Sequence, residues 1–316
     1  MTFTRFAAAA VAVALTAAPV AAQGPQFITV LTGGTSGVYY PLGVAMSEIW
    51  AKGIEGSRTQ VQATKASVEN LNLLQQGKGE VGFALGDSVE MAWAGDAEAG
   101  FPKPLDKIRA MAAIYPNYIQ IVAAANSGID SLDDLKGKSL SVGAAKSGTE
   151  LNARVILEAA GMSYADLGKV EYLPFAESVE LMKNRQLDAT LQSAGLGVAS
   201  LKDLATSTPI TVIPVPAELV QKIGGAYHTA IVPGGTYTGQ DTDVPTAAVT
   251  NILVTHEDVP EEVVYQMTKQ MFEGLDSIKA AHAAGRDIDP SKATDNLPIP
   301  LHPGAERYYR EAGILK

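Results

Sequence analysis

Apolar residues along the chain follow two alternating patterns, short continuous runs and positions spaced three or four residues apart. The short runs are bounded by turn residues, a pattern typical of buried strands. Strands are therefore expected at 27–32, 81–85, 108–114, 118–125, 139–144, 170–175, 188–193, 210–215 and 248–255.

Between several of these runs, apolar residues recur at the spacing of one helix face. Ser67 is expected to cap a helix that ends at Gly77. Ser147 and Glu150 form a capping-box pair at the start of a second helix, which ends at Gly161. These patterns predict short amphipathic helices between the strands.

A longer helix is expected over 260–284, where apolar residues again recur at helical spacing. Strands that alternate with helices of these lengths predict an α/β fold, with mostly parallel sheets flanked by helices.

The chain contains two stretches typical of passages between domains. The first is the long extended segment 113–128, and the second is the proline- and glycine-rich run 233–245. Crossings there would give one lobe of residues 26–124 plus 247–316 and a second lobe of residues 125–246. A chain that leaves a lobe and returns to it forms two hinge crossings around a cleft, where ligands usually bind.

The N-terminus has a pattern of its own. Arg5 precedes an apolar segment at 6–18, and small residues follow up to Ala22. This is the pattern of a secretory signal peptide, residues 1–22, cleaved near Ala22. The apolar segment is too short and too rich in alanine for a membrane span, so the mature chain is expected outside the cytoplasm.

Composition narrows the possible functions. The chain has 316 residues, 47 % of them hydrophobic, which suits about two globular domains. Its formal charge of −10 becomes −11 when the signal peptide removes Arg5, and no basic stripe is present, which argues against nucleic-acid binding. Cysteine is absent, so disulfides and thiolate chemistry are excluded.

Three strand–turn–helix junctions combine small and hydroxyl residues. They are "LTGGTSGVYYPLG" at 31–43, "TKASVEN" at 64–70 and "VGAAKSGTE" at 142–150. The N-terminus of a helix presents unpaired amides and the positive end of the helix dipole, which favour anions. Each turn alone is typical of ordinary helix capping, but three of them in a two-lobed chain indicate anion capture.

Sequence motifs for enzymes are missing. The first glycine-rich turn has neither the Walker A lysine nor the G-x-G-x-x-G spacing, and "LQSAG" at 191–195 lacks the first glycine of a nucleophile elbow. The four histidines show no i, i+4 pair, so a zinc site has little support. We therefore expect no catalytic residue, no metal and no cofactor.

Several blocks together resemble a known family. "GGTSGVYYPLG", "ASVENLNLLQQGKGEVGFALGD", "IYPNYIQIV", "SLDDLKGKSLSVGAAKSGTE" and "VTNILVTHEDVPEEVVYQMTKQMFE" occur in this order. They are similar to the solute-binding proteins of TRAP transporters, in particular the TAXI subfamily. The resemblance covers nearly the whole mature chain and implies a periplasmic, type II-like binding protein of two lobes. It further implies that the lobes close on a small carboxylate, glutamate and 2-oxoglutarate among the family ligands.

The resemblance also implies a partner. Such a receptor delivers its solute to TRAP membrane permease subunits, which an ion gradient drives. A monomer is the simplest state for a receptor that works by closing its lobes. A periplasmic sensing subunit for a sensor kinase and an exported hydrolase are the alternatives.

The resemblance carries over to individual residues. The matching positions assigned to ligand binding are Gly34, Thr35, Gly37, Tyr39, Ser67, Asn70, Asp87, Tyr115, Ser147, Gly148 and Thr149. We expect Thr35 and Ser67 to hold one carboxylate, and the 147–149 turn to hold the other. Tyr39 and Tyr115 would cover the carbon chain and donate their hydroxyls. Glu69 also matches, either to neutralise a ligand ammonium or to orient Asn70 as a cap.

Two positions depart from the family pattern. Lys146 and Ala66 stand where glycine is usual before each serine of the two turns. Lys146 could pair with a second ligand carboxylate or point to solvent. Direct pairing predicts a dicarboxylate such as 2-oxoglutarate as the ligand, with glutamate next.

Overall fold

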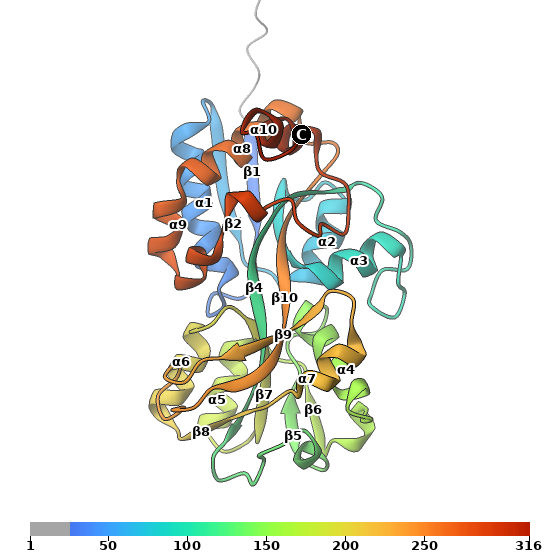
Figure 1. Ribbon diagram of the computed structural model, residues 1–316, viewed down its shortest axis with the longest axis vertical. Helices are drawn as coiled ribbons and strands as arrows, with labels where there is room; N and C mark the ends of the chain where they lie inside the picture. Colours follow the sequence, from blue (N-terminus) through green and yellow to red (C-terminus); the bar gives the residue numbers. More distant parts are fainter. Residues whose placement is uncertain (1–25) are drawn as a thin grey trace, which may run out of the picture.

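The computed structural model describes residues 26–316, which form two lobes stacked along the long axis of the molecule (Figure 1). The predicted signal peptide, residues 1–22, lies outside the described residues. No helix of the described part is long and apolar enough to cross a membrane.

Ten strands form one connected sheet, in the order β2-β1-β3-β10-β4-β7-β5-β6, with β8 paired to β4 and β9 to β10. Lobe 1 contains β1 (Gln26–Leu31), β2 (Ser57–Gln62) and β3 (Val81–Leu85). Lobe 2 contains β5 (Ser139–Ser141), β6 (Lys169–Glu171), β7 (Ala189–Ala194), β8 (Ile210–Ile213) and β9 (Tyr227–Val232).

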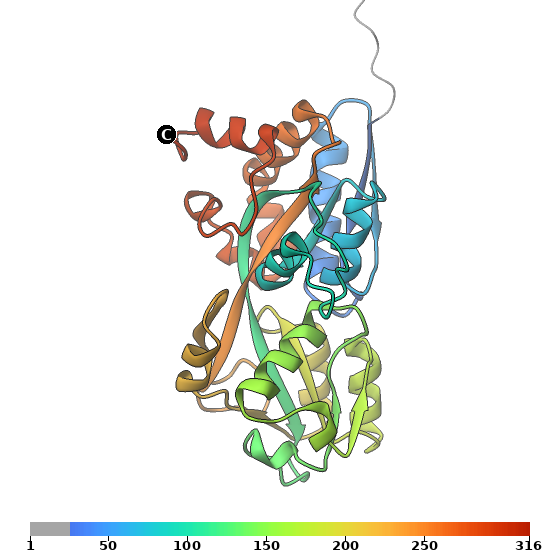
Figure 2. The same cartoon turned by 90° about the vertical axis from the view of Figure 1, so that its right-hand side faces the viewer.

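Two long strands, β4 (Ile108–Ala124) and β10 (Val244–His256), run side by side through both lobes (Figure 2). β1 pairs in parallel with β2 and β3, and β5 pairs in parallel with β6 and β7. Every antiparallel pair involves β4 or β10. The α/β fold expected from the sequence is thus confirmed, and the antiparallel pairs are those made by the two strands that run through both lobes.

The sequence predicted two strands where β4 is one. Pro116 lies inside β4, opposite Thr250, and the register of β4 against β10 shifts next to this pair. Such an irregularity is where a sheet tolerates a proline. Tyr118 pairs with both β10 and β7, and beyond it β4 pairs with β7 and, over Ile121–Ala124, also with β8. The sheet therefore changes partner within β4, ahead of the lobe boundary proposed after residue 124.

Helices cover the sheet in both lobes. Those of lobe 1 are α1 (Tyr39–Gly53), α2 (Ser67–Gln75), α3 (Gly86–Ala94), α8 (Glu261–Glu273), α9 (Leu275–Ala281) and α10 (Pro303–Glu311). Those of lobe 2 are α4 (Gly148–Ala159), α5 (Phe175–Lys183), α6 (Ala199–Ser207) and α7 (Ala217–Ile223). Short 3-10 turns occupy Asp133–Leu135, Tyr164–Asp166, Ala283–Asp287 and Pro290–Lys292.

Three predictions about elements were wrong. The strand expected over 170–175 ends at Glu171, and the helix α5 begins at Phe175. The helix expected over 260–284 is broken at Gly274, which packs so closely on Ile49 that a Cβ there would lie 2.6 Å from Ile49 Cδ1. The strands β2 and β9 were missed because most of their residues are polar or partly exposed, so neither forms a continuous apolar run.

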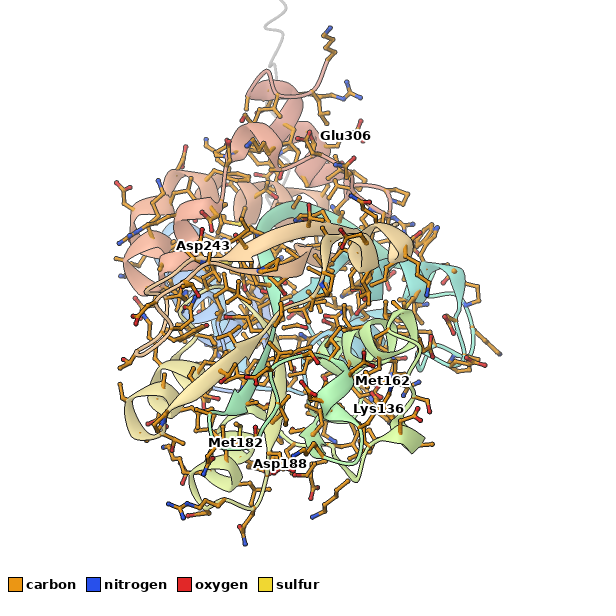
Figure 3. All side chains as sticks on the ribbon, turned by 60° about the horizontal axis from the view of Figure 1, so that its bottom comes forward. Lys136, Met162, Met182, Asp188, Asp243 and Glu306 are labelled. Atoms are coloured by element: carbon orange, nitrogen blue, oxygen red, sulfur yellow. The ribbon has the colours of Figure 1, made fainter. Side chains whose placement is uncertain are left out.

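Each lobe has buried apolar side chains on both faces of its sheet. In lobe 1, the Trp50 indole is fully buried and donates a hydrogen bond to the Met267 carbonyl at 2.9 Å, which joins α1 to α8. At the outer end of lobe 2 (Figure 3), Asp188 accepts hydrogen bonds from the amide and hydroxyl of Ser139 at 2.8 and 2.7 Å. The first contact holds two helices of lobe 1 together, and the second joins β5 to the residue before β7 in lobe 2.

Candidate functional site

A cavity of about 120 Å³ lies between the two lobes. The first residues of four helices border it, α1 and α2 from lobe 1 and α4 and α5 from lobe 2. Its lining residues are Gly33, Gly34, Gly37, Val38, Tyr39, Thr64, Lys65, Ala66, Ser67, Leu85, Tyr115, Asn117, Ala144, Ser147, Gly148, Thr149, Pro174, Phe175, Ser193 and Ala194. Both lobes and the crossing strand β4 thus contribute to one site.

The lobes touch beside this cavity. A Cβ added to Gly148 at the start of α4 would lie 2.6 Å from the Ser67 hydroxyl oxygen at the start of α2. The Glu69 amide of α2 donates a hydrogen bond to the Lys146 carbonyl of lobe 2 at 3.3 Å. The structure therefore has the lobes in contact, with the starts of α2 and α4 facing each other.

Helix amides at the cavity are free to bind a ligand. Among the described residues, no acceptor takes the amide hydrogens of the lining residues Ser67 in α2 and Gly148 and Thr149 in α4. Unpaired amides at a helix N-terminus carry the positive end of the helix dipole. Two facing helix starts can therefore bind a negatively charged oxygen without a cation.

Two buried tyrosines line the cavity. The Tyr39 hydroxyl donates to the Asn251 side-chain oxygen at 2.5 Å, so in this conformation it has no hydrogen left to donate to a ligand. The Tyr115 side chain is 1 % exposed, and its hydroxyl has no partner among the described residues. Burial raises the pKa of both phenols above the ordinary value, so both are neutral. Tyr115 is a ready hydrogen-bond donor for a ligand.

The structure brings eight of the twelve predicted site residues to the cavity wall. These are Gly34, Gly37, Tyr39, Ser67, Tyr115, Ser147, Gly148 and Thr149. Four other predicted residues, Thr35, Asn70, Asp87 and Lys146, are outside the lining set. Thr35 and Lys146 are exposed, whereas Asn70 and Asp87 are buried.

Asn70 joins backbone segments under the site. Its side-chain amide donates to the Thr32 carbonyl at 2.7 Å and to the Phe83 carbonyl at 2.8 Å, and its oxygen accepts from the Thr64 hydroxyl at 2.6 Å. These bonds hold the ends of β1 and β3 beside the start of α2. In this conformation Asn70 acts as a positioning residue.

Asp87 connects the lobes. Its carboxylate accepts hydrogen bonds from the Asn152 side-chain amide and the Tyr227 hydroxyl, both at 2.6 Å, and from the Ser88 amide at 2.7 Å. Asn152 and Tyr227 belong to lobe 2, whereas Asp87 belongs to α3 of lobe 1. Burial, the largest influence, raises the pKa of Asp87. Two of the partner residues of Asp87 come from the opposite lobe.

The two departures from the family glycine pattern have a backbone explanation. Ala66 and Lys146 adopt positive φ angles of 70° and 65°, a region that favours glycine. Each precedes the serine of its turn. The lysine that lines the cavity is Lys65 rather than Lys146.

The capping predictions hold for only one helix. Ser147 accepts a hydrogen bond from the Glu150 amide at 3.1 Å, but the Glu150 carboxylate binds Arg154, so the capping box is half formed. Ser67 does not cap α2, because Ala66 holds the cap position and the Ser67 hydroxyl oxygen accepts from the Leu85 amide at 3.1 Å. Glu69 accepts from the Lys65 amide at 2.6 Å rather than orienting Asn70 directly.

The sequence did not single out a buried polar chain beneath the cavity. The Asn251 amide donates to Asn117 at 2.9 Å, Asn117 donates to the Ser193 carbonyl at 3.1 Å, and the Ser193 hydroxyl donates to Asn152 at 2.6 Å. Asparagines at apolar strand positions ("YPNY", "VTNIL") were the signal available. Phe175 was also missed as a lining residue. No group of three metal-ligating side chains occurs in residues 26–316.

A comparison with protein-family models shows which family the chain belongs to. A model described as the NMT1-like family matches residues 30–313, nearly the whole described chain. The chain belongs to the NMT1-like family. The more specific TAXI assignment is carried by the sequence blocks alone.

Solved structures show where this NMT1-like fold recurs. A structure described as a periplasmic transporter has a TM-score of 0.58 at 11 % identity, over 92 % of this chain and 94 % of that one. The alkanesulfonate-binding protein SsuA of Xanthomonas axonopodis pv. citri, bound to MOPS, has a TM-score of 0.53 at 13 % identity, over 93 % and 96 %.

A putative L-cystine ABC transporter protein of Listeria monocytogenes has a TM-score of 0.52 at 16 % identity, over 84 % of this chain and 98 % of that one. At these identities the similarities show the fold. The NMT1-like chain therefore has the two-lobed fold of periplasmic solute-binding proteins.

Proposed function

We propose that this NMT1-like protein is an exported solute receptor that captures a small carboxylate between its lobes. The observation that carries the proposal is the closed cavity, where unpaired amides of α2 and α4 and the unpartnered Tyr115 hydroxyl are buried together. Buried donors without acceptors are unfavourable unless a ligand satisfies them. A carboxylate supplies several acceptor lone pairs and a negative charge that suits the helix starts.

Capture works through the equilibrium between open and closed lobes. A ligand that binds both lobes shifts the population toward the closed form by its difference in affinity for the two forms. The contacts between Ser67 and Gly148 and between Glu69 and Lys146 exist only when the lobes meet. The closed surface is then what a membrane partner recognises.

The ligand class follows from the sequence and from the cavity together. A dicarboxylate such as 2-oxoglutarate, or glutamate, is the starting hypothesis. The hypothesis that a second carboxylate pairs with Lys146 requires this side chain to turn toward the ligand, because it is exposed and outside the lining set. Lys65 offers an alternative partner from lobe 1.

The partner is proposed to be the permease of a TRAP transporter. Support comes from the sequence blocks that resemble the TAXI subfamily. In membrane vesicles that contain the permease, receptor-dependent uptake should continue without ATP and stop when the ion gradient is collapsed. Uptake that requires ATP and survives the collapse would assign the receptor to a different transporter class.

A ligand screen of mature protein, residues 23–316, tests the central proposal. A thermal-shift assay with small carboxylates, neutral amino acids and inorganic anions is followed by calorimetric titration of each hit. A ligand present at 100 times its Kd stabilises the protein by about 2.7 kcal/mol. Stabilisation by one or more carboxylates supports the proposal. Protein shown to be ligand-free that responds to no carboxylate would refute it.

A further inference from the structure

The side chains that line the cavity carry a positive charge but no negative charge, which bears on the charge of the ligand. Among the twenty lining residues there is one cationic side chain, Lys65, and no Asp, Glu or His. A ligand ammonium needs acceptors, ideally a carboxylate, because it donates three hydrogen bonds and accepts none. The lining residues supply no such carboxylate.

The carboxylates just outside the lining set already have partners. Asp87 accepts from Asn152, Tyr227 and Ser88. Glu69 accepts from the Lys65 amide at 2.6 Å, and Glu150 binds the Arg154 guanidinium through both oxygens at 2.7 and 2.9 Å. None of these carboxylates is a lining residue, and each already binds protein donors.

Acceptors on the lining residues are also in use. The carbonyls of Gly34, Ala144 and Pro174 accept from the amides of residues 37, 147 and 178 at 3.0–3.1 Å. The Asn117 side-chain oxygen accepts from Asn251, and the Ser193 carbonyl accepts from Asn117. The lining residues thus carry one ammonium, several unpaired donors and no carboxylate.

Those donors are the amides of Ser67, Gly148 and Thr149, the hydroxyls of Tyr115 and Ser147, and the Lys65 ammonium. Ser147 accepts a backbone hydrogen bond from the Glu150 amide through its oxygen, which leaves its O–H to donate, whereas the Ser67 hydroxyl already binds Leu85 and Tyr39. A wall of donors satisfies carboxylate and carbonyl oxygens and leaves an ammonium desolvated without partners.

We infer that the ligand is a compact organic acid without an ammonium group, a 2-oxo, hydroxy or plain carboxylic acid, and that the site rejects the matching amino acids. This inference rests on the proposed function and narrows its ligand class. The cavity volume of about 120 Å³ suits a compact molecule, since a cavity of about 150 Å³ in another protein holds benzene.

Matched pairs of acids test the inference. Calorimetric titration of residues 23–316 at pH 7 compares 2-oxobutyrate with 2-aminobutyrate, and 2-oxoglutarate with glutamate. Each pair keeps the carbon skeleton and exchanges the oxo group for an ammonium. In any pair that binds, we expect the oxo acid to bind about 10- to 100-fold more tightly, the factor for one buried polar group left without a partner.

The outcomes separate this inference from the proposed function. Equal or tighter binding of an amino acid would overturn the inference and leave carboxylate capture standing. If neither these acids nor any other carboxylate in the screen binds, the proposed function falls, and the inference falls with it.

A variant pair locates the donor. Tyr115→Phe removes the unpartnered hydroxyl and should weaken oxo-acid binding about 10-fold while retaining the fold. Tyr118→Phe is the matched control, because Tyr118 lies on the same strand and is not a lining residue. Unchanged oxo-acid affinity in Tyr115→Phe would contradict the assignment of donors to the cavity wall.

Discussion

The starts of α2 and α4 face each other across the cleft and are built from similar local sequences. Each has a non-glycine residue at positive φ, Ala66 or Lys146, followed by a serine. Each begins with two amides that have no acceptor among the described residues. Two lobes thus present the same kind of helix end, with unpaired amides, to one cavity.

The two serines nevertheless do different work. Ser147 caps its own helix by accepting from the Glu150 amide, so the start of α4 is capped by a residue of its own turn. Ser67 accepts from the Leu85 amide, so the start of α2 depends on the neighbouring strand β3. Similar local sequences can therefore produce a self-contained helix end in one lobe and one held by its surroundings in the other.

The largest expected effect comes from preventing the two helix starts from meeting. Gly148→Val adds side-chain atoms where a Cβ alone would lie 2.6 Å from the Ser67 hydroxyl oxygen and 2.7 Å from Leu85 Cδ1. Overpacking of about 1–3 kcal/mol against the closed form should raise the Kd about 10- to 100-fold. Calorimetric titration with the best acid measures this change.

Glu158→Ala, an exposed change on the same helix, is the control for Gly148→Val and should leave the Kd unchanged. Wild-type affinity in Gly148→Val would mean that ligand binding does not require these helix starts to touch.

Asp87 is expected to affect ligand affinity through its contacts with lobe 2. Asp87→Ala removes the carboxylate that Tyr227 and Asn152 bind, so the closed form should lose about 1–2 kcal/mol, about 10-fold in Kd. A double-mutant cycle with Tyr227→Phe measures the coupling between the two side chains. Strong coupling supports a contact between lobes, whereas additive effects would favour the direct ligand role predicted from the sequence.

Backbone strain is a feature that the two turns share. Ala66→Gly and Lys146→Gly each relieve a positive φ, worth about 1–2 kcal/mol, but glycine adds about 0.4–1 kcal/mol of unfolded-state entropy. We expect each variant to unfold at a higher urea concentration, with a net gain of about 0.5–1 kcal/mol. Ala145→Gly, beside Lys146 but outside the positive-φ region, should be destabilised instead. Stabilisation of that control would remove the argument from strain.

The smallest expected effect is a change in folding stability with pH. Burial raises the pKa of Asp87 in the folded, closed protein above its unfolded value, so the folded form binds this proton more tightly. This contribution therefore favours the folded form as pH falls and opposes it as pH rises through the folded pKa. The difference in thermal midpoint, wild type minus Asp87→Asn, should increase between pH 7 and pH 4.5. A difference that decreases would contradict the direction of the shift.

The sequence predicted the α/β fold and much of the cavity wall because both depend on local signals. Turns at 31–43, 64–70 and 142–150 contain glycine or hydroxyl residues, and all three helix starts border the cavity. The fourth, at Pro174–Phe175, has neither a glycine nor a hydroxyl residue and gave no signal. Local reasoning works where the turn itself carries the chemistry.

Contacts between distant segments could not be predicted in this way. Asn251 and Asn117 stand in apolar strands, and their pairing depends on β10 lying next to β4. The partners of Asp87 come from α4 and β9, more than sixty residues away along the chain. A motif identifies a buried polar residue, but only the tertiary arrangement determines whether it faces a ligand or another side chain.

The position of β10 has a consequence for how the chain folds. β10 lies between β3 and β4, so the sheet of lobe 1 cannot close until residues after 244 reach it. Pairing between strands so far apart along the chain slows folding, because a long loop must close first. A partly synthesised chain can therefore complete lobe 2 before lobe 1. The last quarter of the sequence sets the moment at which lobe 1, and with it the cavity between the lobes, is complete.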